Sequence, residues 1–252
     1  MRFFRNVLTQ TTIARCLLIA AAVFLVAGYA HAGIITFSGQ DDGAPTTGPF
    51  PTSTAAATAF AAAAGALSPI GLITFEDQPL GFNSSFTAAP GVTVNISGGV
   101  TFGDGFSGVS TTTFGNVFVF NTTPAGAKWL GFPGDSATFS FASPTDYFGF
   151  WLTGVQTIFT SALTVSFTDG SGPQVLNAPI NVNGGAAYFG FTDAGQSISS
   201  ITILNTSTES GTDAWGIDDV SYDTTTPEPA SLLLLGSGAL GLAAMLRRKR
   251  LQ

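Results

Sequence analysis

The chain has very little of the side-chain chemistry on which most enzyme sites are built. It contains one Cys (Cys16) and one His (His31) in 252 residues. Residues 33–226 have neither, no Arg, and a single base, Lys128, against fourteen acids, which gives a formal charge of −13. A Ser-His-Asp triad, a Cys nucleophile, a Cys/His zinc site and a disulfide are therefore excluded in this section. A basic surface for nucleic acid is excluded as well, so we expect no nucleic-acid partner.

The first 32 residues have the organisation of a secretory signal peptide. Three arginines lie within the first fifteen residues, and the apolar stretch 17–28 follows them. Ala30 and Ala32 then form an A-x-A cleavage site directly before Gly33. We therefore predict export through the secretion translocon, with cleavage between Ala32 and Gly33. The alternative is a permanent N-terminal membrane helix.

Residues 226–250 contain three signals in a fixed order. Pro227-Glu228-Pro229 holds the chain extended after any preceding strand. Residues 230–246 carry no charge and, as a helix, would span about 25 Å, which is the short end of a membrane helix. Four bases follow and are expected on the cytoplasmic side, which leaves the body translocated; they are Arg247, Arg248, Lys249 and Arg250.

This ordered set resembles the PEP-CTERM sorting signal of exported bacterial proteins. The resemblance implies recognition by an exosortase, a membrane-embedded cysteine protease, and cleavage near Pro227-Glu228-Pro229. It further implies an inner-membrane intermediate with the body outside the cytoplasm, then a location at the cell surface or in the medium. Such proteins are typical of Gram-negative bacteria that make extracellular polysaccharide, which implies a biofilm setting. The alternative is a plain single-pass anchor.

The start of the body predicts little strand. Residues 33–54 are rich in Gly, Pro and Thr, and they predict a loop-rich segment. Residues 55–66 are mostly Ala and predict a short helix that packs Phe60 on a sheet. A flexible Ala/Thr linker is the alternative for the same residues.

Beyond residue 71 the sequence alternates between apolar and Ser/Thr positions, with Gly, Asn, Asp and Pro between the runs. Such alternation is typical of strands that bury one face of a sheet. We therefore predict an all-β fold: a single antiparallel β-sandwich, jelly-roll-like, over residues 55–223, flanked by the signal peptide and the C-terminal transmembrane helix. The alternating runs are 73–76, 92–96, 117–120, 137–141, 163–167 and 201–204.

The final predicted strand, 215–222, resembles the closing strand of jelly-roll carbohydrate-binding modules. In many such modules the first and last strands are neighbours, and carboxylates on them hold a structural calcium ion. The resemblance implies that run 73–77 pairs with 215–222. The first choices for calcium ligands are Glu76 and Asp219, and the second choices are Asp77 and Asp218.

Calcium is the metal that this composition permits, because it takes oxygen ligands and needs neither nitrogen nor sulfur. The alternative is that Asp218 and Asp219 are exposed charges that discourage edge-to-edge strand pairing. In a regular strand Ile217 and Val220 point to opposite faces, so the sequence also predicts a bulge or burial on both faces.

Sugar binding has one candidate side chain. Trp129 follows Lys128 in a Gly/Pro-rich stretch and is the best candidate for an exposed stacking surface, whereas Trp151 and Trp215 are expected in the core. Nothing in the spacing of the acids marks a catalytic carboxylate pair, so a carboxylate-only glycoside hydrolase ranks third. The first hypothesis is an exported, non-enzymatic envelope or matrix protein. The second is a carbohydrate-binding module, with calcium as its cofactor if it has one.

Overall fold

The computed structural model describes residues 33–97, 108–111, 113, 115–133, 136–207 and 214–224. The predicted signal peptide (1–32) and the predicted sorting signal with its membrane helix (226–250) lie outside these residues. Among the residues that are described, no helix is both long enough and apolar enough to cross a membrane.

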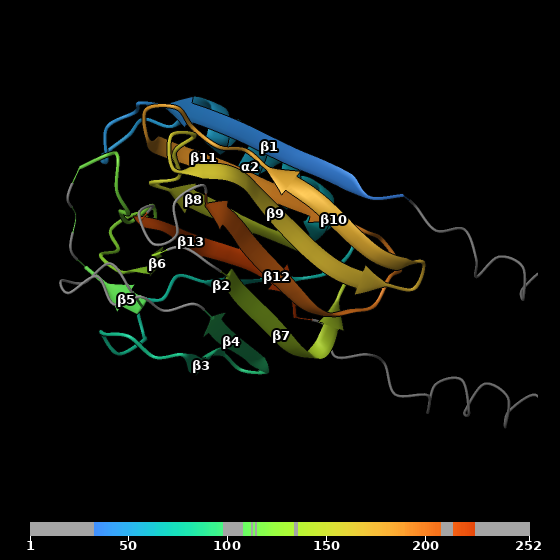
Figure 1. Cartoon of the computed structure of the whole chain (residues 1–252). Helices are drawn as coiled ribbons and strands as arrows, with labels where there is room; N and C mark the ends of the chain where they lie inside the picture. The colour runs from blue at the N-terminus through green and yellow to red at the C-terminus, as the bar shows by residue number, and fades with distance from the viewer. Residues whose placement is uncertain are drawn as a thin grey trace, which may run out of the picture. The chain divides into compact units, whose positions relative to one another are not determined.

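The described part of the chain forms two antiparallel sheets and one helix (Figure 1). The seven-stranded sheet has the order β1 (Ile35–Asp42), β11 (Gly185–Thr192), β8 (Tyr147–Thr153), β13 (Ala214–Asp223), β6 (Trp129–Pro133) and β5 (Gly108–Ser110), with β2 (Ile70–Ile73) beside the second half of β13. The six-stranded sheet has the order β10 (Gly172–Ala178), β9 (Thr160–Asp169), β12 (Ile198–Ser207), β7 (Ser136–Thr145), β4 (Val92–Ser97) and β3 (Ser85–Ala89). The predicted all-β class is confirmed, whereas the jelly-roll-like connectivity stays a prediction.

Aromatic side chains from the two sheets meet in one core. The rings of Phe139 on β7 and Phe148 on β8 have centroids 5.3 Å apart. The rings of Phe167 on β9 and Phe191 on β11 stack in parallel at 4.5 Å. Burial of each such side chain contributes about 1.5–3 kcal/mol. This burial stabilises a section of the chain in which no disulfide can form.

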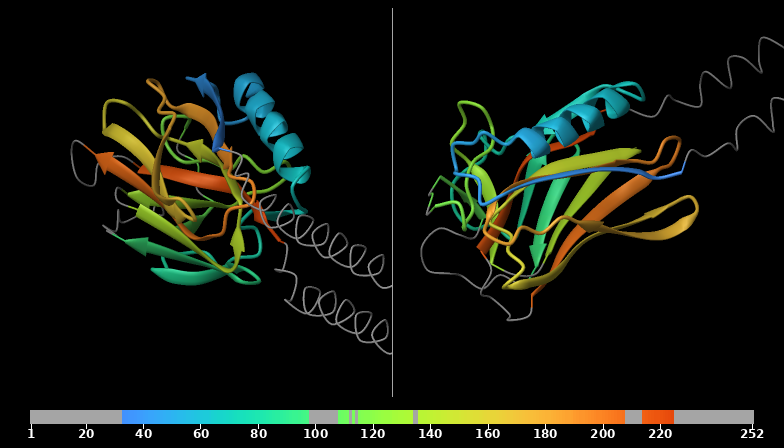
Figure 2. Two further views of the ribbon diagram at one scale, coloured as in Figure 1. Left: turned by 90° about the vertical axis from the view of Figure 1, so that its right-hand side faces the viewer. Right: turned by 90° about the horizontal axis from the view of Figure 1, so that it is seen from above.

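Helix α2 (Pro51–Gly65) covers the outer face of the seven-stranded sheet, next to β1, β11 and β8 (Figure 2). Phe60 is buried there among Phe37, Tyr147 and Tyr188, with ring centroids 5.8–6.0 Å away. A Cβ on Gly190 would lie 2.7 Å from the Phe60 ring, so glycine is needed at that position for the ring to seat. The predicted helix and the packing of Phe60 on a sheet are confirmed.

The prediction that 33–54 is a loop-rich segment is wrong over β1, which is a full edge strand paired with β11. Helix α2 also begins within that range, at Pro51, where proline suits the first helical turn. Asp41, at the end of β1, accepts hydrogen bonds from the backbone N–H groups of Thr52 (3.0 Å) and Ser53 (2.8 Å). A strand residue thus caps the helix, which a reading of the helix sequence alone does not reveal.

Strand β13 is irregular where the sequence requires it to be. Between Asp218 and Ser221 its register against β8 shifts, so that three steps along β13 lie opposite two along β8. Asp219 has a φ of 47° at this bulge. The extra residue lets Ile217 and Val220 both enter the core, where both are fully buried. The predicted bulge is confirmed.

The predicted pairing between the early strand and β13 is also confirmed, with a shift in position. Strand β2 pairs antiparallel with β13, Val220 opposite Ile73, but it ends at Ile73, where the predicted run 73–76 begins. Phe75 has a φ of 60° and starts a turn. The run 117–120, predicted as a strand, is a turn and coil instead, and the Thr153 hydroxyl bonds both the N–H and the carbonyl of Phe120.

Both described ends of the body lie at the same end of the seven-stranded sheet (Figure 1). One row of paired residues runs across it: Thr36 to Phe191, Phe191 to Phe148, and Phe148 to Tyr222. Neighbouring strands lie about 4.8 Å apart, so β1 and β13 are separated by about 14 Å. The start of β1 and the end of β13 therefore lie close together at this end of the sheet.

Replacement of Phe60 by Ala should lower the free energy of unfolding by about 3–5 kcal/mol, because it leaves a cavity between the helix and the sheet. Thermal unfolding of the two proteins measures the difference. Phe82→Ala is the matched control, since Phe82 is 44 % exposed and its loss should cost much less. Equal melting temperatures for the two variants would contradict the packing of Phe60 between helix α2 and the seven-stranded sheet.

Candidate functional site

The described part of the chain ends at Thr224, shortly before the predicted sorting signal. The backbone N–H and the hydroxyl of Thr224, directly after β13, both donate to the Pro69 carbonyl, at 3.3 and 3.0 Å. Only Thr225 and Thr226 separate this anchored residue from Pro227. In the sequence, the predicted sorting signal therefore follows β13 after a very short connection.

A second feature is a group of three carboxylates, Glu76, Asp218 and Asp219, which we call the carboxylate cluster. Glu76 lies in the turn after β2, and the two aspartates lie at the bulge of β13. The hydroxyl of Thr123 donates to both aspartates, at 3.2 Å and 2.8 Å. The structure thus brings together three of the four predicted calcium ligands. The fourth, Asp77, is exposed on the turn.

Glu76 holds the loop 121–128. Its Oε1 atom accepts hydrogen bonds from the backbone N–H groups of Ala127 and Lys128, both at 2.8 Å, and from the Asn121 amide at 3.2 Å. The Lys128 ammonium donates to the carbonyls of Glu76 (2.6 Å) and Gln78 (2.8 Å). Burial opposes ionisation, but the N–H donors and the Lys128 charge lower the pKa of Glu76. The single base of residues 33–226 is therefore used to fix this loop.

Asp218 anchors the same loop from β13. Its carboxylate is fully buried and accepts hydrogen bonds from the backbone N–H groups of Thr122 (2.7 Å), Thr123 (3.1 Å) and Asp219 (2.8 Å). Burial and the neighbouring Asp219 charge outweigh these donors and raise the pKa of Asp218 to about 7. Burial and the charge of Glu76 raise the pKa of Asp219 as well. The cluster thus concentrates negative charge in a poorly solvated place.

Most of the carboxylate oxygens in the cluster already accept hydrogen bonds, which leaves few oxygen ligands for calcium. Ca²⁺ takes six to eight oxygen ligands that converge on one point. Here Glu76 Oε1 and both oxygens of Asp218 already accept N–H or O–H donors from the chain. Within the described ranges, no set of three or more His, Cys, Asp or Glu side chains is placed to hold a metal ion. The structure therefore offers the calcium prediction no support, and it stays a prediction.

Two of the three tryptophans, Trp129 and Trp151, differ in burial from the sequence prediction. Trp129 is completely buried on β6, so its prediction as an exposed stacking surface is wrong. The Lys128 backbone N–H donates to Glu76, and the adjacent Trp129 pairs with Ser110 of β5. Trp215 is fully buried, as predicted. Trp151 is half-buried on the outer face, between Tyr188 and Phe50.

The loop that completes the cluster was not identified from sequence. Asn121, Thr122 and Thr123 contribute donors to it, yet a run of short polar residues between apolar segments is common in any loop. One signal was available: Lys128, the single base in an acidic body, marks the place where negative charges gather.

Comparison with known proteins identifies the C-terminal region alone. Residues 225–249 match the PEP-CTERM protein-sorting motif. No curated protein and no solved structure matches the chain. The chain therefore carries a PEP-CTERM sorting motif at its C-terminus, behind a β-rich body, and the motif marks it as an exported protein addressed to an exosortase.

Stability of the metal-free protein should decrease as pH rises from 5 to 7.5. Asp218 binds its proton more tightly in the folded protein than in the unfolded chain, so protonation favours folding below the folded-state pKa of about 7. The loss should be about 3 kcal/mol over this range. Thermal unfolding in a chelating buffer measures it.

Asp219→Asn should reduce this pH dependence, because it removes the neighbouring charge that raises the pKa of Asp218. Asparagine also tolerates the positive φ at this position. Asp77→Asn is the control for loss of an exposed charge, and it should leave the dependence unchanged. A wild-type stability that is constant between pH 5 and 7.5 would contradict the buried, proton-binding Asp218.

Calcium binding at the cluster requires ionised carboxylates, whereas the metal-free protein is stabilised by protonation of Asp218. Bound calcium stabilises ionised carboxylates, so if the predicted site binds calcium, millimolar calcium raises the melting temperature at pH 7.5 and removes the pH dependence. The doubly substituted Glu76→Gln, Asp219→Asn protein should lose the shift. Melting curves that are identical with and without calcium would dispose of the predicted site, as would a shift that this variant retains in full.

Proposed function

We propose that this protein is an exported, non-enzymatic component of the cell envelope or extracellular matrix. In this proposal the secretion translocon exports the chain and an exosortase cleaves it near Pro227-Glu228-Pro229. The released β-sandwich then associates with extracellular polysaccharide in a biofilm. The observation that carries the proposal is the PEP-CTERM motif at 225–249, which starts directly beyond the last strand of a folded body.

The positions of the chain ends support a membrane-bound intermediate. The start of β1 and the end of β13 lie at one end of the seven-stranded sheet. From Thr224 to Ala230 the chain can span at most about 20 Å when fully extended. With residues 230–246 in the bilayer, as we propose, this end of the sandwich is held toward the membrane surface. The exosortase then meets its cleavage site beside the folded body.

The structural roles of the acids support the non-enzymatic part of the proposal. Several carboxylates accept backbone N–H groups and thereby fix loops or cap a helix. Asp42 accepts the N–H groups of Val182 (2.8 Å) and Asn183 (2.7 Å), and Asp169 accepts those of Ser171 (2.7 Å) and Gly172 (3.0 Å). Carboxylates that hold the fold are poorly suited to act as a general acid or a nucleophile. A carboxylate-only glycoside hydrolase is therefore the weaker proposal.

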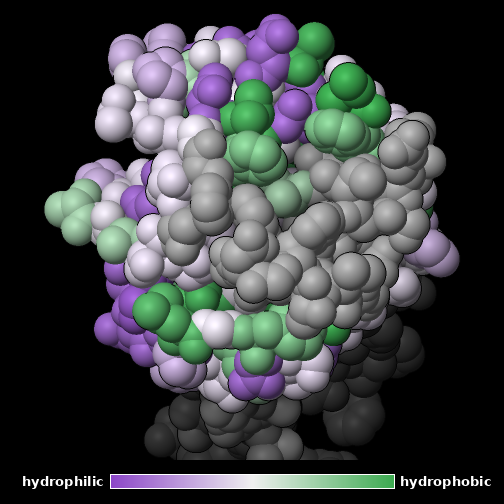
Figure 3. Space-filling view, turned by 60° about the vertical axis from the view of Figure 1, so that its left-hand side comes forward, coloured by the Kyte–Doolittle hydropathy of each residue, from purple (hydrophilic) through white to green (hydrophobic). Residues whose placement is uncertain are grey.

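The character of the surface is consistent with a protein that works outside the cell among polar polymers. On the face that Figure 3 shows, hydrophobic side chains lie in separate patches among hydrophilic ones. Exposed large hydrophobic residues include Leu80, Ile158 and Val175, which belong to different parts of the chain. The charge of −13 over residues 33–226 keeps such a body soluble and repels acidic partners.

Substitution of Pro227, Glu228 and Pro229 by Ala should block processing and hold the chain in the membrane fraction of the native host. Thr225→Ala with Thr226→Ala is the matched control, because it changes the same short stretch outside the motif. The size of the protein in membrane and medium fractions measures the effect. Release of the triple variant at the wild-type level would contradict exosortase processing at this motif.

A further inference from the structure

Three exposed apolar side chains lie together where helix α2 is followed by strand β2. Leu67 is 41 % exposed, Ile70 37 % and Leu72 57 %. Ile70 and Leu72 point to the same face of β2, because alternate residues of a strand share a face. A Cβ on Gly65, the last residue of α2, would lie 3.8 Å from the Ile70 side chain, so the strand residues adjoin the helix. We call Leu67, Ile70 and Leu72 the apolar patch.

The apolar patch belongs to a stretch of sequence without charge. Residues 43–75 contain no Asp, Glu, Lys or Arg, whereas the rest of residues 33–226 holds fourteen acids. Helix α2 lies within this stretch, and its exposed residues are only Ala, Thr, Gly and Pro. A surface helix normally carries charged or strongly polar residues on its outer side. This surface can therefore enter an apolar environment without removing water from any charged group.

Hydrogen bonds fix the connection between α2 and β2 against the end of β13. The Tyr147 hydroxyl donates to the Pro69 carbonyl at 2.9 Å and accepts a hydrogen bond from the Ser68 hydroxyl at 3.2 Å. The backbone N–H and the hydroxyl of Thr224 donate to the same Pro69 carbonyl. The apolar patch is therefore held directly beside the last described residue of the body.

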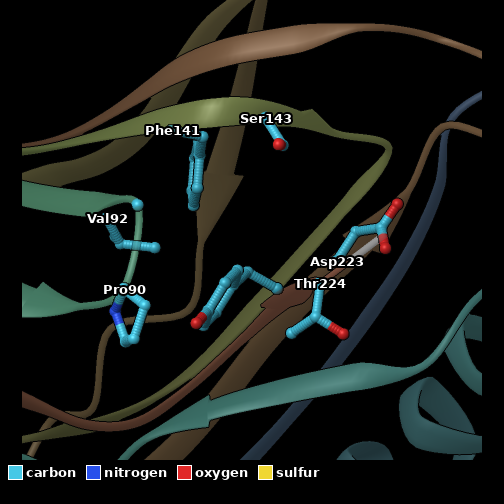
Figure 4. Close-up of a pocket in the computed structure, with 8 residues that line it drawn as sticks. Pro90, Val92, Phe141, Ser143, Asp223 and Thr224 are labelled. Atoms are coloured by element: carbon cyan, nitrogen blue, oxygen red, sulfur yellow. The ribbon is translucent and has the colours of Figure 1, made fainter. Parts of the chain in front are cut away.

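A pocket of about 320 Å³ lies at the same end of β13, between β13, β7 and the turn from β3 to β4 (Figure 4). Three of its apolar lining residues, Val92, Phe141 and Tyr222, are buried in the core. The apolar patch differs from this pocket, because its side chains are exposed to solvent.

We propose that the apolar patch docks on the lipid bilayer while the sorting signal still holds the chain in the membrane. This inference rests on the proposed function, in which residues 230–246 occupy the bilayer. From Thr224 to Ala230 the chain can span at most about 20 Å. The apolar patch is bonded to Thr224 through Pro69, so it stays close to the membrane surface. Leu and Ile side chains gain free energy when they are buried in the interfacial region of a bilayer.

The short tether makes a weak contact sufficient. A short linker gives an effective concentration on the order of millimolar, so a contact that is too weak to hold a free protein is populated when the protein is tethered. Stable anchoring of a free protein needs more buried apolar surface than three partly exposed side chains provide. Docking would thus orient the body before cleavage and would not retain it at the membrane afterwards.

The acidic body selects among lipids. Its charge of −13 is repelled by anionic headgroups over a distance of about 8 Å at physiological ionic strength. We therefore expect docking on zwitterionic phosphatidylcholine, weaker docking when phosphatidylglycerol is added, and recovery at high salt.

The experiment measures insertion of the apolar patch in the full-length chain, reconstituted into phosphatidylcholine vesicles. Cys16→Ser removes the natural cysteine, and Leu72→Cys carries a fluorophore whose emission is quenched by nitroxide-labelled lipid. Ala142→Cys is the matched control. Ala142 is exposed on β7 beside Phe141, whose ring lies 5.9 Å from that of Tyr222, so it marks the same end of the body on the other sheet. The label at position 72 should be quenched strongly, and the label at position 142 much less.

A variant of the apolar patch tests whether its side chains cause the insertion. Leu67→Ser with Ile70→Ser should lower the equilibrium constant for docking at least about tenfold, as reported by the label at position 72. Ile158→Ser with Val182→Ser removes two exposed apolar side chains outside the patch and should leave the quenching unchanged. All four residues are exposed, and thermal unfolding confirms that each variant is folded.

Four results would overturn this assignment. They are equal quenching at positions 72 and 142, no quenching at either position, stronger quenching when phosphatidylglycerol is added, and full quenching in the folded Leu67→Ser, Ile70→Ser protein. If unlabelled Leu72→Cys chains cross-link to one another in detergent and the label is not quenched by lipid, a second copy covers the patch instead. None of these results bears on exosortase processing, which is read from fragment sizes in the host, and failure of processing would not alter the quenching.

Discussion

Strand β13 is the element on which the rest of the structure depends. It pairs with β8 along one edge, and with β6 and then β2 along the other. Its bulge places Ile217 and Val220 in the core, and Asp218 in contact with the loop that Glu76 also binds. Because β13 is the last strand in the described part of the chain, the seven-stranded sheet cannot be completed until all of its other strands have been synthesised. The PEP-CTERM motif follows it directly.

Residues 33–226 carry fourteen acids and one base, so their negative charges must be stabilised by means other than ion pairs. In this protein, carboxylates bind backbone N–H groups: Asp41 caps the helix, Asp42 and Asp169 hold turns, and Glu76 and Asp218 hold the loop 121–128. Hydrogen bonds to charged groups are stronger than neutral ones and fix loop geometry. The acids therefore help to stabilise the fold through hydrogen bonds. Burial of the apolar and aromatic core side chains stabilises it further.

The period-two pattern was enough to predict the sheets, and the mismatch between Ile217 and Val220 was enough to predict either a bulge or burial on both faces, because both depend on side-chain direction along a strand. The Ala-rich segment and Phe60 likewise predicted a helix on the sheet. Strand β1 was missed, because an edge strand with Gly39 and two terminal aspartates gives little alternation. The run 117–120 alternates and yet forms a turn, since Thr153 supplies its hydrogen bonds.

The site was less predictable than the fold. Resemblance to carbohydrate-binding modules indicated that Glu76, Asp218 and Asp219 would meet, but their hydrogen-bond partners come from a loop that only the tertiary structure places there. Trp129, directly after this loop, is buried on β6 and pairs with Ser110. The pocket at the end of β13 joins residues from three separate segments, and no local pattern marks such a combination.

The central claim is that a self-contained sandwich ends at β13 and is separated from its sorting signal outside the cytoplasm. The intact mass of the protein from its native host, measured separately in membrane and medium fractions, tests this claim most directly. The account predicts a species in the medium that begins at Gly33 and ends near Pro227. A protein found only in the membrane, and still ending at Gln252, would contradict it.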